Sequence, residues 1–179
     1  MSQVGKLNMV NAKLGATMPG QQTTRNIFDT ATTAVAGQTR FSFFKNFAGK
    51  TEFETNLTSN KLDSSESMVI KSIFIETNDL AGLAGMSKIN IKVGNQVVLK
   101  DYNISYNVGN RGTAFARIQS GTSSPYNVEV RLLTDIVIPP QTNFEVELEQ
   151  VFSPASTVGT KFQLHLKGYG VIFSAGSSF

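Results

Sequence analysis

The chain has 179 residues and a mass of 19.4 kDa, which suits one domain with a core of its own. Sixteen basic and 13 acidic residues give a formal net charge of +3 without a dense Lys/Arg run, so composition does not indicate a polycationic nucleic-acid binder. Cysteine is absent, which excludes disulfides and thiolate metal sites, and no apolar stretch reaches the roughly 18 residues of a membrane helix.

Residues 1–38 differ in composition from the rest of the chain. The stretch 11–38 is rich in Thr, Ala, Gly and Gln, and no apolar period persists in it. Such a segment cannot bury enough apolar area to fold alone. We therefore predict an extended N-terminal arm over residues 1–38, with its docking segment at Arg25, Ile27 and Phe28. The N-terminus lacks the apolar core of a signal peptide, so synthesis in the cytoplasm is expected.

From residue 39 onward, strand patterns follow one another and helix patterns are almost absent. Gly94–Asn95 is a turn that predicts a hairpin between the segments on either side of it. About eight strands at this spacing predict a mainly β domain over residues 39–179, an antiparallel β-sandwich. The predicted strands are 40–47, 68–75, 88–93, 96–100, 113–118, 127–132, 143–149 and 161–173.

Phenylalanines and glutamates mark the faces of two of these strands. Phe41, Phe43 and Phe47 alternate as core residues do, which favours burial over a base-stacking surface, so we expect weak or no direct nucleic-acid binding. Three glutamates at positions 145, 147 and 149 share one strand face. Successive carboxylates there are about 7 Å apart, too far to chelate one ion. We predict a solvated acidic face that meets basic neighbours, such as Arg131, Lys161 and Lys167, in adjacent strands or in other subunits.

Candidate catalytic or metal-binding residues are few. The single histidine, His165, is expected on the outward side of its strand, and no second His or Cys could share a metal with it. No phosphate-binding glycine loop and no nucleophile elbow of the G-x-S-x-G type occurs. We therefore predict no catalytic, cofactor-binding or metal-binding residue, no cofactor, and a protein that is not an enzyme.

The segment 136–146 (IVIPPQTNFEV) joins an apolar strand end, two prolines, a polar pair and an alternating strand. This segment, with the closing stretch 162–173, resembles single jelly-roll capsid proteins of viruses, small bacteriophages in particular, over about residues 39–175. The resemblance implies an eight-stranded jelly roll. It also implies a virion protein that is made in the host cytoplasm and contacts copies of itself and other virion proteins. Strands 127–132 and 143–149 could instead pair as a hairpin, and the sequence leaves both arrangements open.

The function expected from these features is that of a capsid subunit whose N-terminal arm contacts neighbouring subunits in an icosahedral shell. The terminal Phe179 would be a second contact. The alternative is a binding module, such as the receptor- or carbohydrate-binding head of a fibre or spike. Exposed Tyr102 and Tyr106 would be its aromatic platform.

Overall fold

The structure is a computed structural model that describes residues 20–78, 86–103, 126–150 and 158–173. Within these ranges the chain forms strands and loops but no helix. The strands are β1 (Gly20–Thr32), β2 (Arg40–Phe43), β3 (Glu66–Thr77), β4 (Met86–Val93), β5 (Gln96–Asn103), β6 (Tyr126–Ile138), β7 (Phe144–Gln150) and β8 (Lys161–Phe173).

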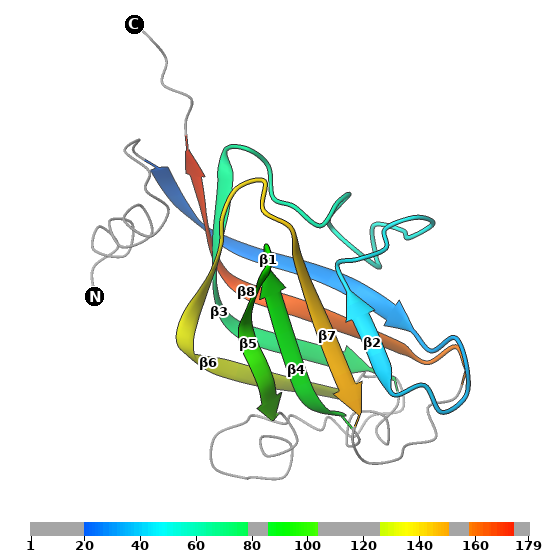
Figure 1. The fold of residues 1–179 in the computed structure, drawn as a ribbon. Helices are drawn as coiled ribbons and strands as arrows, with labels where there is room; N and C mark the ends of the chain where they lie inside the picture. The colour runs from blue at the N-terminus through cyan, green and yellow to red at the C-terminus, as the bar shows by residue number, and fades with distance from the viewer. Residues whose placement is uncertain (1–19, 79–85, 104–125, 151–157, 174–179) are drawn as a thin grey trace, which may run out of the picture.

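These strands form two four-stranded antiparallel sheets, with the orders β1-β8-β3-β6 and β2-β7-β4-β5. The first strand pairs with the eighth, the second with the seventh, the third with the sixth and the fourth with the fifth. This nested pairing is that of a long ribbon rolled up on itself, which is the jelly roll. The second sheet lies in front of the first in Figure 1. The prediction of an antiparallel β-sandwich is confirmed.

The structure decides between the two arrangements left open for the strands on either side of the proline pair. β6 lies in the first sheet beside β3, and β7 lies in the second sheet between β2 and β4. The loop with Pro139 and Pro140 therefore crosses from one sheet to the other. The predicted strand at 113–118 lies outside the described residues.

β1 corrects the predicted boundary of the N-terminal arm. Residues 20–32, assigned to the arm from their composition, pair with β8 along their whole length, from Gly20 opposite Phe173 to Thr32 opposite Lys161. The sandwich therefore includes residues from Gly20 onward, and the domain start at residue 39 was wrong. Composition misled because β1 is an edge strand held by its backbone ladder, with Ile27 as its one large apolar residue in the core. Residues 1–19 lie outside the described residues.

The core lies between the two sheets and follows the predicted alternation. Phe41 of β2 contacts Phe162 of β8 across the interior, with ring centroids 4.7 Å apart. β7 shows the pattern most cleanly, because its residues alternate between buried and half-buried along the whole strand. The predicted hairpin is also present, since the two-residue turn at Gly94 joins β4 to β5. Burial of the phenylalanines at 41, 43 and 44 excludes them as a stacking surface.

β3 is apolar on both faces for a reason that the sequence did not show. Ile70 lies opposite Gly168 of β8, but the next paired residues are Ser72 and Lys167, so Lys71 is an extra residue in β3. This β-bulge reverses the alternation, and the inward positions change from Met68 and Ile70 to Ile73 and Ile75. The predicted inner position of the strand is confirmed, since β3 lies between β8 and β6.

Candidate functional site

The three predicted docking residues of the arm lie in β1, within the sandwich. Ile27 is fully buried in the core, so it cannot contact a neighbouring subunit in this fold. Arg25 forms an ion pair with Glu66 of β3, with 2.7 Å between Nε and Oε1. Phe28 is half-buried and contacts the His165 ring. The prediction was wrong for Ile27, and Phe179 lies outside the described residues.

His165 lies on the outward face of the first sheet, as predicted, but it is well packed there. Its ring lies between those of Phe28 and Phe74, with centroids 5.3 Å from each. Nε2 is 3.3 Å from Glu76 Oε1, and Nδ1 is 3.2 Å from the Asn26 side chain. These contacts hold the imidazole in a structural cluster on the surface of the sheet. No nucleophilic side chain is among its hydrogen-bond partners in the described part of the chain.

The acidic face of β7 meets basic residues, but they are different residues from those predicted. Arg40 of β2 lies 3.3 Å from Glu149 and 4.0 Å from Glu147, and Lys92 of β4 lies 2.9 Å from Glu145. The predicted partners at 131, 161 and 167 belong to β6 and β8, in the other sheet. The kind of interaction is as expected, and the partners follow from the strand order.

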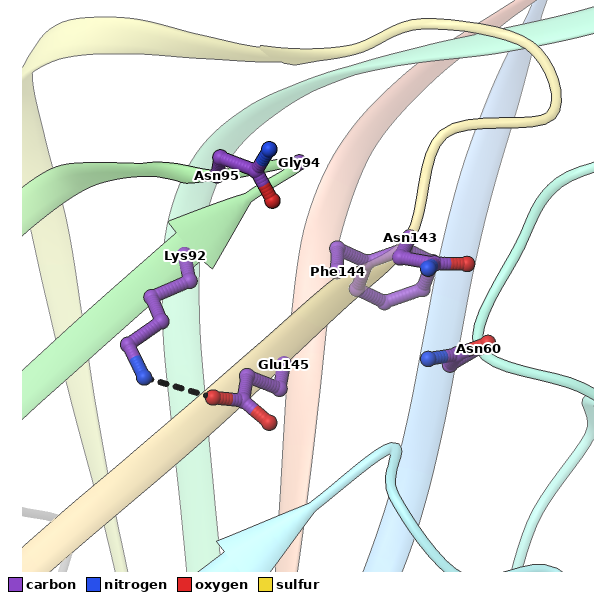
Figure 2. Close-up of a pocket in the computed structure, with 7 residues that line it drawn as sticks. All are labelled: Asn60, Lys92, Gly94, Asn95, Asn143, Phe144 and Glu145. Atoms are coloured by element: carbon purple, nitrogen blue, oxygen red, sulfur yellow. Dashed lines mark hydrogen bonds and ion pairs between the residues drawn. The ribbon is translucent and has the colours of Figure 1, made fainter.

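A polar pocket of about 390 Å³ lies where the β4–β5 turn meets the start of β7. Two backbone hydrogen bonds fix its walls, from Gly94 N to Asn143 O (2.7 Å) and from Phe144 N to Asn60 O (3.0 Å). Figure 2 shows the amides of Asn60 and Asn143 beside the Phe144 ring, with Asn95 across from them. Within the described ranges these three amides have no side-chain hydrogen-bond partner, so they are available to a polar ligand.

The charged pair in this pocket is poorly suited to acid–base chemistry. The hydrogen bond from Lys92 lowers the pKa of the Glu145 carboxyl, despite its partial burial. The same bond raises the pKa of Lys92. At neutral pH both groups therefore stay charged, whereas a general acid or base needs a pKa near the working pH. The pocket can donate and accept hydrogen bonds, but it does not assemble a reacting centre.

A second, larger groove lies between the edge strands β5 and β6 and has a volume of about 790 Å³. Val98 and Tyr102 line it from β5, and Leu132 and Ile136 line it from β6. On its rim Leu133 is 98% exposed. We call Leu133 together with this groove the knob–groove edge.

A large β-bulge makes Leu133 protrude. Ile70 of β3 pairs with Ile136 of β6, and the next pair is Ser72 with Arg131. Between these two pairs β3 spans two residue steps, whereas β6 spans five. β6 therefore carries three extra residues, which cannot stay in the ladder. Lys71, the extra residue of β3, forms an ion pair with Asp135 at the base of this bulge. Partial burial alone would lower the pKa of Lys71, but its contacts with Asp135 and Tyr169 outweigh that effect and raise it.

Sequence reasoning missed this edge. The only signal was the pair Leu132–Leu133, two adjacent leucines in a strand that otherwise alternates. In the described part of the chain no group of three or more His, Asp or Glu side chains is arranged to hold a metal ion. Nor does any helix in that part have the length and hydropathy to cross a membrane. No family model matches the chain, and a search of curated proteins found no similar sequence.

Proposed function

We propose that the chain is a virion structural protein, a capsid subunit that assembles with copies of itself into a closed shell. The fold supports this, since the eight-stranded jelly roll is an architecture of viral capsid proteins. Other proteins share the fold, so fold alone does not decide the function. The observation that carries the proposal is the knob–groove edge, an apolar surface that stays exposed in the part of the chain that the structure describes.

The N-terminal segment has a narrower role in this proposal than composition suggested. Because β1 belongs to the sandwich, the arm that contacts neighbouring subunits is restricted to residues 1–19. Those residues contain few charges and several apolar side chains, including Val4, Leu7 and Met9. A deletion of residues 1–38 would remove an entire edge strand. The informative deletion therefore stops before Gly20.

Deletion of residues 1–19 is expected to leave a folded sandwich with weakened self-association. Circular dichroism should show an unchanged β spectrum, because β1 and its ladder with β8 remain. Size-exclusion chromatography with light scattering should show high-mass assemblies for the full chain and smaller species for the truncated chain at equal concentration. A full chain that stays monomeric up to the highest soluble concentration would refute the capsid proposal, and a truncated chain that assembles normally would remove the arm from it.

The binding-module alternative retains one specific observation in its favour, the three available amides at Asn60, Asn95 and Asn143. Amides can donate and accept hydrogen bonds with sugar hydroxyls at once. Its predicted aromatic platform is weaker, because Tyr102 is half-buried against the core, and Tyr106 lies outside the described residues. A glycan array with wild type and Asn143→Ala tests the alternative, which needs binding that the substitution removes.

A further inference from the structure

We infer that the knob–groove edge is a contact between two copies of this chain. This inference rests on the proposed function and specifies which surface carries it. The edge lies at the open side of the sandwich, where β5 borders one sheet and β6 the other. Among the described strands neither has a neighbour in its own sheet on that side, and the groove opens there between the two sheets.

The exposure of this edge marks it as a contact surface. Leu133 is 98% exposed, and Val97 and Val98 of β5 are 47% and 42% exposed. Val97 and Val98 lie at one of the two register shifts between β5 and β4, where the alternation of the strand is broken, and both side chains stay partly exposed. Single exposed apolar residues are ordinary on a protein surface, but Leu133 and Val98 line one mainly apolar groove of about 790 Å³.

A second copy is the occupant that this surface fits best. A two-fold contact uses the same patch on both partners, so the patch must be complementary to itself. Here a protruding leucine and a groove able to receive one lie side by side on each copy. Of the described residues that line the groove, Asp135 alone is charged, and Lys71 neutralises it. Two copies can therefore meet at this edge without the repulsion of like charges.

The contact forms through side chains rather than by extension of a sheet. The pairing of β5 with β4 is irregular at two places, and Asp101 of β5 has a φ of 48°. Such irregularities are a common way in which edge strands avoid pairing with another strand. The knob of one copy therefore enters the groove of the other, where Leu99 and Tyr102 would cover it.

The test compares Leu133→Asp with Val35→Asp in the full chain. Val35 is 62% exposed in the β1–β2 loop, so both substitutions place a carboxylate at an exposed apolar position. Both variants should keep the thermal stability of the wild type. We expect Leu133→Asp to raise the dissociation constant for self-association about thirtyfold or more in sedimentation velocity, the loss typical of an interface hot spot. Val35→Asp should associate as the wild type does.

Since the chain has no cysteine, Leu133→Cys also gives a single-site cross-linking probe. A short bismaleimide should join two copies through Cys at position 133, and a Val35→Cys control should stay monomeric on a denaturing gel. If wild type and Leu133→Asp associate equally, the inference is wrong and the capsid proposal stands. An equal loss in Val35→Asp would also overturn the inference. If the wild type does not associate at all, the capsid proposal fails, and the inference with it.

Discussion

Replacing Asp29 with alanine is expected to lower the free energy of unfolding by about 3 kcal/mol, a large part of the 5–15 kcal/mol typical of a domain. Asp29 of β1 is fully buried. Its carboxylate accepts hydrogen bonds from the Phe44 backbone N–H and from Lys50 Nζ, both at 2.6 Å. Alanine would leave the buried N–H without an acceptor and the half-buried ammonium without its counter-charge.

The contact with Asp29 also fixes the way in which β2 ends. Phe44 has a φ of 60°, an unusual conformation for a residue with a large side chain. This backbone turn lets the consecutive residues Phe43 and Phe44 both enter the core. The pairing of β2 with β7 ends at Phe43, so the Phe44 backbone N–H lies outside that ladder and is held by Asp29 instead.

Chemical denaturation should show a larger loss of stability when this buried ion pair is broken than when a more exposed Lys–carboxylate pair is broken. Lys161 and Glu54 lie 2.7 Å apart near the solvent, where an ion pair contributes little, so Glu54→Ala should lower the free energy of unfolding much less than Asp29→Ala. Asp29→Asn keeps an oxygen for the Phe44 N–H, so it should lower the free energy of unfolding less than Asp29→Ala does. Equal, small losses for Asp29→Ala and Glu54→Ala would show that Asp29 does not hold the end of β2.

Replacing Gly168 with alanine is expected to destabilise the sandwich by on the order of 3 kcal/mol, through overpacking. A Cβ at this position would lie 1.9 Å from the carbonyl oxygen of Val69 and 2.9 Å from its carbonyl carbon. Both atoms belong to the backbone of β3, which lies between β8 and β6 and cannot move without disturbing both ladders. The close approach occurs beside the bulge at Lys71.

Gly170 is the matched control, two residues further along the same strand. A Cβ there would find its nearest neighbours at 3.4–3.5 Å, close to ordinary van der Waals contact. Thermal unfolding should therefore show a large drop in the midpoint for Gly168→Ala and a small change for Gly170→Ala. Equal midpoints for the two variants would contradict the close packing of β3 against β8.

The sequence predicted strands best where side chains alternate between core and solvent. β7 and the β4–β5 hairpin follow such patterns, because one face is buried and the turn at Gly94 sets the pairing. β1 could not be found in this way. Its ladder with β8 uses backbone groups, which every residue carries, and its side chains are mostly polar.

The knob–groove edge escaped prediction because its cause is a mismatch between two strands. In β6, Val128 and Val130 before the bulge and Ile136 and Ile138 after it all occupy even positions, so the alternation shows no interruption. The three extra residues become visible only when β6 is paired with β3. Likewise, Arg40 and Lys92 could be assigned to the acidic face only after the order β2-β7-β4 was known.

Negative-stain electron microscopy of the purified full chain tests the central claim, self-assembly of this jelly roll, most directly. We predict uniform closed particles in the wild type and their loss in Leu133→Asp, since that substitution places a charge on an apolar contact. Fields of small, separate particles of monomer size at every concentration would contradict self-assembly. The amide pocket at Asn60, Asn95 and Asn143 would then be the surface to follow.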